Sequence, residues 1–91
     1  MPRVASAAAT HIGARLAERR RELGLTQDEV GVRSQIDSAN VRAYENGRAM
    51  PSVHSLVRLA WALDLEPGRL LEGLTPEHFD AAPASARAAG S

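Results

Sequence analysis

The segment 38–43 carries side chains suited to hydrogen bonding with a polar partner. Asn40 has an amide that both donates and accepts, and Arg42 has a guanidinium with a fork of donors. In proteins that contact nucleic acid, Asn can pair with adenine and Arg with guanine, each pair contributing about 1–3 kcal/mol of discrimination. Both residues can act on one partner only if a single rigid element presents them to solvent.

Patterns that would indicate catalysis are missing from the sequence. The three histidines, His11, His54 and His78, are isolated from one another, and the chain has no cysteine. Metal-ligand spacings, a glycine-rich phosphate loop and a nucleophile elbow are missing as well. We therefore predict a protein that is not an enzyme and that uses no cofactor or metal.

Helix-start signals define two short helices around Asn40 and Arg42. Thr26 and Glu29 form a capping box, because Thr26 can accept the amide hydrogen of Glu29 while the Glu29 side chain returns to the amide of Thr26. The first of the two helices therefore begins at Thr26 and ends in a turn at 34–36. Asp37 is a good N-cap for the second, which we place at about 38–46.

The faces of this second helix predict which side chains it buries. At 100° per residue, Val41, Tyr44 and Glu45 share one face, which we expect to point inward. A lone inward carboxylate would cost several kcal/mol. Arg20 lies one turn after Leu16 on the apolar stripe of the upstream helix, so we predict an inward ion pair between Arg20 and Glu45. The alternative is that both are ordinary exposed charges. The opposite face and its flanks carry Ala39, Asn40, Arg42, Ala43 and Asn46.

Three further helices complete the expected fold, an all-α domain of five helices. The first spans about 10–23 with Thr10 as its cap, although the preceding alanines could extend it backward. The fourth spans about 53–63. The fifth spans about 67–72 and begins with a proline, and we expect Leu70 and Leu71 to face inward.

Ninety-one residues make one domain, with boundaries set by composition. We expect 1–9 to form a flexible N-terminal arm and 10–74 to form the helical domain. The remaining 75–91 would be a tail with one helical turn and then a disordered, alanine-rich segment. The chain has no apolar stretch of about 18 residues and no signal-peptide core. We therefore predict a cytoplasmic protein with no membrane contact.

The formal net charge is zero, which taken alone argues against a nucleic-acid partner. The charges are unevenly distributed, however. Residues 1–50 hold eight Arg against six acids, and 51–91 hold three Arg against five acids. Because DNA binding depends more on where the cations lie than on their total, the net charge does not exclude it.

Two segments, RRELGLTQDEVGVRS and IDSANVRAYENGRAMPSVHSLVRLAWALDL, resemble the Cro/repressor-type (XRE) helix-turn-helix family of bacterial and phage regulators. The resemblance covers about Ile12–Leu74. Its spaced matches include Thr26-Gln27, Glu29-Val30, Tyr44-Glu45-Asn46-Gly47 and Pro51-Ser52. The sequence departs from the family pattern at Gln35, where the turn usually has Gly, and at Gly31, where Ala is usual.

The resemblance implies a five-helix lambda-repressor-like domain that binds double-stranded DNA, with the helix at 38–46 in the major groove. It implies base contacts from Ser38, Ala39, Asn40, Arg42 and Ala43. It implies phosphate contacts from Gln27, Asn46 and Arg48, with Arg33 a weaker candidate. The alternative is that these polar residues merely solvate an exposed helix.

The resemblance also implies a small transcriptional regulator, which we expect to be a dimeric repressor. Phage-type repressors, antitoxins and restriction-modification controllers all occur at this size. The alternative is a protein-interaction module of the same fold, such as an antitoxin or co-regulator. Such a module would bind a partner protein through the Ala39/Ala43 face or through the surface around Trp61.

Two aromatic residues do not fit a closed core. Trp61 lies between two alanines, and Phe79 lies in an otherwise polar tail. In one interpretation the tail folds back so that Phe79 covers Trp61. In the other, Trp61, Leu65 and Leu74 form a dimer contact.

Overall fold

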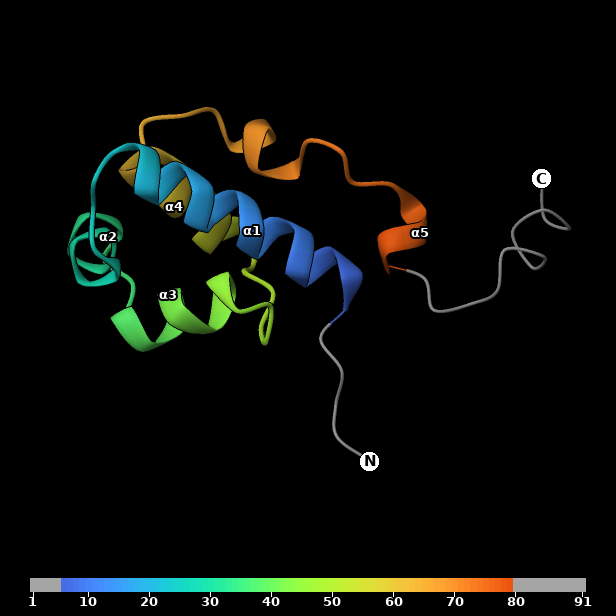
Figure 1. Cartoon of the computed structure of the whole chain (residues 1–91), viewed down its shortest axis with the longest axis horizontal. Coiled ribbons are helices and arrows are strands. Elements are labelled where there is room, and N and C mark those ends of the chain that lie inside the picture. The colour runs from blue at the N-terminus through green and yellow to red at the C-terminus, as the bar shows by residue number, and fades with distance from the viewer. Residues whose placement is uncertain (1–5, 80–91) are drawn as a thin grey trace, which may run out of the picture.

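Helices form the framework of this chain. The computed structural model describes residues 6–79, in the order α1 (Ala7–Glu22), α2 (Gln27–Ser34), α3 (Ser38–Glu45), α4 (Val53–Ala62), the 3₁₀ helix η1 (Pro67–Leu71) and α5 (Pro76–Phe79). Figure 1 shows α1 crossing the middle of the domain, with α2 and α3 on one side and η1 and α5 along the other. No strand occurs in the described part of the chain, so the predicted all-α class is confirmed. None of the helices within 6–79 is long and apolar enough to cross a membrane.

A single core is enclosed by α1, α2, α3, α4 and η1. Its buried members are Ile12, Leu16, Val30, Val41, Leu56, Leu59, Ala60, Leu63 and Leu70. The members from α4 recur at intervals of three and four residues, which is the inward stripe of an amphipathic helix. Each fully buried leucine contributes about 1.5–3 kcal/mol to stability. The core therefore fixes the positions of α2 and α3.

The first helix begins earlier than its expected cap. Ser6 is the N-cap, and its hydroxyl accepts the amide hydrogen of Ala9 at 3.0 Å. Ala8 and Ala9 are buried, so the alanine run packs as helix, in keeping with the high helix propensity of alanine. The expected start at Thr10 is therefore wrong, and the earlier start holds. The segment 7–9, expected to belong to a flexible arm, is helical, and 1–5 lie outside the described residues.

The expected fifth helix is the 3₁₀ helix η1, and only one of its two leucines faces the core. Leu70 is buried, whereas Leu71 is 40% exposed, so the expectation of an inward Leu71 is wrong. With three residues per turn, adjacent residues of a 3₁₀ helix point about 120° apart. The turn expected after it forms as α5, which packs against α1. The rest of the expected tail, 80–91, lies outside the described residues.

The predicted capping box and turn are both present between α1 and α3. The Thr26 hydroxyl accepts from the Glu29 amide at 3.0 Å, and the Glu29 carboxylate accepts from the Thr26 amide at 2.8 Å. Gln35 ends α2 with φ 61°, in the left-handed region. At Gly31, an added Cβ would lie 2.8 Å from the carbonyl oxygen of Ile36. The chain therefore makes a tight turn between α2 and α3.

Replacing Gln35 with glycine is expected to raise the free energy of unfolding by about 0.5–1 kcal/mol. The left-handed conformation costs a residue with a Cβ roughly 1–2 kcal/mol, and the greater backbone entropy of unfolded glycine offsets about 0.5–1 kcal/mol of the gain. Urea unfolding followed by circular dichroism measures the change. Gln35→Ala keeps the Cβ and should show no gain. An equal gain in both variants would contradict the strain argument.

Candidate nucleic-acid interface

The position of α3 is set first by a close approach to α1. A Cβ added to Gly13 would lie 2.2 Å from the carbonyl oxygen of Tyr44 and 2.9 Å from that of Glu45. The backbones of the two helices are therefore in direct contact, which requires glycine at this crossing. Sequence reasoning missed Gly13. The available signal was a glycine in the middle of a helical segment, which lowers helix propensity without local benefit.

The predicted ion pair is the second contact that holds α3. The Arg20 guanidinium donates to both carboxylate oxygens of Glu45, with Nε to Oε2 at 2.7 Å and Nη2 to Oε1 at 3.1 Å. Arg20 also donates to the carbonyl of Leu25 at 2.9 Å. The Glu45 side chain is only 5% exposed. The hydrogen bond with Glu45 raises the pKa of Arg20 above its ordinary value, burial opposes that change, and the charge of Glu45 adds to it. Arg20 therefore stays protonated.

Gln27 joins this ion pair at the start of α2. Its side-chain amide donates to Oε1 of Glu45 at 2.9 Å, and the residue is half-buried. An amide nitrogen carries two hydrogens, so the bond to Glu45 leaves one donor for another partner. The network of Arg20, Glu45 and Gln27 thus connects the core to the surface at the N-terminus of α2.

The outer face of α3 presents polar groups that have no partner in the described protein. Ala39, Asn40 and Arg42 are exposed, and Ser38 and Ala43 are half-buried on the same helix. Within residues 6–79, the side chains of Asn40 and Arg42 form no hydrogen bond or ion pair. Unpaired donors on a rigid, exposed helix are available to an external ligand. The α3 face is thus the surface on which the sequence predicted base contacts.

Two further polar side chains lie just beyond α3. Gly47 adopts φ 75°, which turns the chain so that the amide of Arg48 donates to the carbonyl of Ala43 at 3.0 Å. Asn46 and Arg48 are exposed beside the C-terminus of the helix. Arg33 behaves differently, because its guanidinium approaches the Ala62 carbonyl of α4 at 3.5 Å. The structure therefore brings Asn46 and Arg48 to the α3 surface, whereas the contact of Arg33 is with α4.

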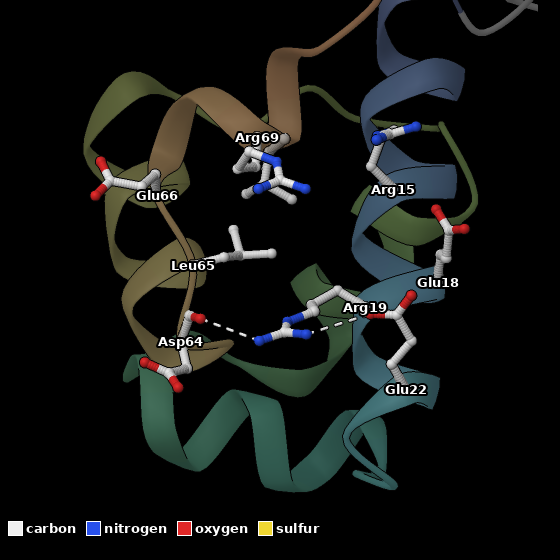
Figure 2. Close-up of a pocket in the computed structure, with 9 residues that line it drawn as sticks. Arg15, Glu18, Arg19, Glu22, Asp64, Leu65, Glu66 and Arg69 are labelled. Carbon is white, nitrogen blue, oxygen red and sulfur yellow. Dashed lines mark hydrogen bonds and ion pairs between the residues drawn. The ribbon is translucent and has the colours of Figure 1, made fainter.

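A polar hollow between α1 and η1 contains a contact that sequence reasoning missed. Figure 2 shows Arg19 reaching from α1 toward the backbone at the end of α4. Its Nε donates to the Leu63 carbonyl at 2.9 Å and its Nη2 to the Asp64 carbonyl at 3.0 Å. The last carbonyls of a helix lack partners and carry partial negative charge, so a guanidinium there stabilises the helix end. Arg19 is therefore a structural link between α1 and α4.

The residues predicted to form a dimer contact differ in exposure. Trp61 is 78% exposed, whereas Leu65 and Leu74 are partly buried and pack against the core. Phe79 is 58% exposed on α5, which packs against α1. The interpretation in which Phe79 covers Trp61 is therefore wrong.

The fold and the α3 face together define a class of protein. A small all-α domain in which two short helices, joined by a tight turn, present the second helix to solvent is a helix-turn-helix domain of the lambda-repressor-like kind. The chain belongs to the family described as "Helix-turn-helix domain", whose model matches residues 11–74. The resemblance to Cro/repressor-type regulators is thereby confirmed.

Known proteins agree with this assignment. The chain is 44% identical over 52 residues to the uncharacterized HTH-type transcriptional regulator y4dJ of Sinorhizobium fredii, covering 57% of this chain and 68% of that protein. It is similar to the restriction-modification controller protein C.AhdI from Aeromonas hydrophila, with 35% identity, a TM-score of 0.67, and coverage of 68% of this chain and 94% of that one. It is also similar to the P22 c2 repressor, solved with a synthetic operator, with 27% identity, a TM-score of 0.64, and coverage of 69% and 96%.

Proposed function

We propose that this chain is a transcriptional repressor that binds a palindromic double-stranded DNA operator as a homodimer, with α3 in the major groove. Each subunit would read one half-site, and the half-sites would lie about 34 Å apart, one turn of DNA. Repression would follow from occupying a promoter, in the cytoplasm and on the nucleoid. The role of DNA-binding regulator agrees with the family, and the P22 c2 repressor provides a related fold solved with operator DNA.

The observation that carries this proposal is the exposed pair Asn40 and Arg42, neither of which has a partner within 6–79. An asparagine amide can pair with adenine, and a guanidinium can donate twice to guanine. Ala39 and Ala43 have short side chains, so they allow the helix to lie deep in the groove and to touch thymine methyls. Ser38 adds a hydroxyl at the start of the helix. Specificity would then rest on few base contacts and on DNA shape.

Phosphate contacts would orient the helix on the duplex. Asn46 and Arg48 are exposed beside the C-terminus of α3 and would bind one phosphate. Gln27 would bind another, using the amide hydrogen that Glu45 leaves free, with help from the backbone amides at the N-terminus of α2. Arg33 would have to leave the Ala62 carbonyl to contribute, so we assign it the weakest part.

Replacing Asn40 and Arg42 by alanine is expected to remove most of the sequence discrimination. Each lost base contact should weaken the free energy of binding to the operator by about 1–3 kcal/mol, which is roughly a fivefold to more than a hundredfold loss of affinity. Fluorescence anisotropy with an operator duplex selected from a random library, and with a scrambled duplex, measures this. Both substitutions lie on the solvent face, so the free energy of unfolding should change by less than about 0.5 kcal/mol.

Arg21→Ala is the matched control for the loss of one exposed arginine, since Arg21 lies on α1 and forms no ion pair within the described residues. The Arg21→Ala variant should prefer the operator over the scrambled duplex as strongly as the wild type does. Failure to select any duplex, or equal discrimination by the wild type and the α3 variant, would overturn this proposal. The logarithm of the wild-type affinity should also fall with the logarithm of salt concentration, at a slope of about −0.9 per neutralised phosphate. An apolar contact with a protein partner would show little salt dependence.

A further inference from the structure

The outward face of α4 carries an apolar stripe that the domain leaves uncovered. Val53, Val57 and Trp61 recur every four residues, with 78%, 46% and 78% of each residue exposed. Residues four apart share one face of a helix. Single exposed apolar residues are common, but a stripe that ends in a largely solvent-exposed tryptophan indicates an interaction surface.

Trp61 separates two hollows of opposite charge. The first is lined, beside Trp61, by Arg33, Ser34, Gln35, Val57 and Arg58. The second is lined, again beside Trp61, by Asp64, Leu65, Glu66 and Pro67. The surface therefore has an apolar centre, a basic flank toward the N-terminal side of α4, and an acidic flank beyond its C-terminus.

One charge on each flank is not used within the domain. Arg58 and Glu66 form no ion pair in the part of the chain that the structure describes. Figure 2 shows the carboxylates of Asp64 and Glu66 pointing away from α1 and its arginines. Both charges are therefore available to a partner.

We propose that a second copy of this chain occupies this surface, with its α4 antiparallel to the first and the two Trp61 side chains at the centre. A two-fold axis through Trp61 reverses the order of the flanks, so Arg58 of one subunit would face Glu66 of the partner subunit, and the reverse pair would form as well. A two-fold contact requires a self-complementary patch, and this arrangement of charges meets that requirement. The inference rests on the proposed homodimer and assigns its interface.

The same pattern argues against other occupants. DNA presents one sign of charge and would be repelled by the acidic flank. A partner protein of one predominant charge would match only half of the surface. A buried tryptophan supplies much of the area and energy of an interface, while charges at the rim fix orientation and suppress wrong pairings. The stripe and its two flanks fit a second copy best.

Trp61 is the only tryptophan of the chain, so its fluorescence reports directly on this surface. The emission maximum should move to shorter wavelength as protein concentration rises, in parallel with dimer formation measured by sedimentation equilibrium without DNA. A protein that stays monomeric, or a dimer in which the emission of Trp61 does not move, would overturn the inference.

Charge reversal tests the pairing itself. Arg58→Glu places a carboxylate opposite Glu66 of the partner subunit, and Glu66→Arg places a guanidinium opposite Arg58 of the partner subunit, so each should dimerise at least about tenfold more weakly than the wild type. An equimolar mixture should form heterodimers with an affinity near that of the wild type, because each of the two contacts between positions 58 and 66 then joins a carboxylate and a guanidinium. A mixture no tighter than either variant alone would contradict the pairing.

Arg21→Glu and Glu18→Arg are matched controls, since both residues are exposed on α1 and line neither hollow. Neither change should alter dimerisation. Circular dichroism establishes that every variant is folded. If the protein dimerises through Trp61 but selects no DNA, the proposed function fails alone. If a dimer binds DNA with the discrimination of Asn40 and Arg42 but forms without a shift in the emission of Trp61, the interface fails alone.

Discussion

Replacing Arg20 by alanine is expected to lower the free energy of unfolding by about 3–5 kcal/mol, the usual result of removing one partner from a buried ion pair. The change leaves the Glu45 carboxylate, 5% exposed, with the Gln27 amide as its remaining side-chain partner. It also removes the bond to the Leu25 carbonyl. Small domains are stable by about 5–15 kcal/mol. The variant should therefore be close to unfolding at room temperature.

Urea unfolding measures this loss, and two comparisons separate its causes. Arg21→Ala, at the exposed neighbouring position, should change stability by less than about 0.5 kcal/mol. The double substitution Arg20→Met with Glu45→Met should recover most of the loss, because apolar residues of similar volume carry no buried charge to desolvate. A double variant as unstable as Arg20→Ala would show that the hydrogen bonds, and not the unpaired carboxylate, account for the effect.

Gly13→Ala is expected to destabilise the protein by about 3 kcal/mol, at the upper end for overpacking. Glycine to alanine inside a helix ordinarily stabilises by about 0.5–1 kcal/mol, so the expected sign is reversed. The reason is the position of the new Cβ, 2.2 Å from the backbone oxygen of Tyr44. Backbone cannot rotate away as a side chain can, so α1 and α3 must separate. The loss should appear in urea unfolding and as weaker binding to the selected operator.

Gly68→Ala is the matched control for this substitution. Gly68 has no atom within 4 Å of the added Cβ, and its φ is not in the left-handed region. The free energy of unfolding of Gly68→Ala should equal that of the wild type or exceed it by about 0.4–1 kcal/mol. Similar behaviour of the two variants would show that the approach of α1 to α3 is not tight in solution.

These two substitutions act on opposite ends of one contact. Gly13 lets α1 touch the C-terminal part of α3, and Arg20, two turns later, binds Glu45 of the same helix. The face of α3 that carries Asn40 and Arg42 is therefore oriented by α1 and not by the preceding turn alone. Substitutions of Gly13 and Arg20 should change DNA affinity without any contact between these residues and the bases.

The sequence by itself determined the features that depend on residues close together in the chain. The capping box of Thr26 and Glu29 spans three residues, and the N-cap at Asp37 spans two. The inward face of α3 follows from helical geometry over one turn and a half. Even the Arg20–Glu45 pair could be predicted, because each charge lay on a face already assigned to the core and required a partner.

Only the tertiary structure decided the features that depend on backbone atoms supplied by distant segments. Gly13 is required because carbonyls of α3 lie against it, and Arg19 is held by carbonyls 44 and 45 positions away. Leu71 is exposed because η1 turns Leu70 toward the core, and Trp61 is exposed because α5 packs against α1. Spacing along the chain predicts which side chains share one face of a helix. It does not predict which distant backbone segment packs against that face, because that contact depends on how the helices pack.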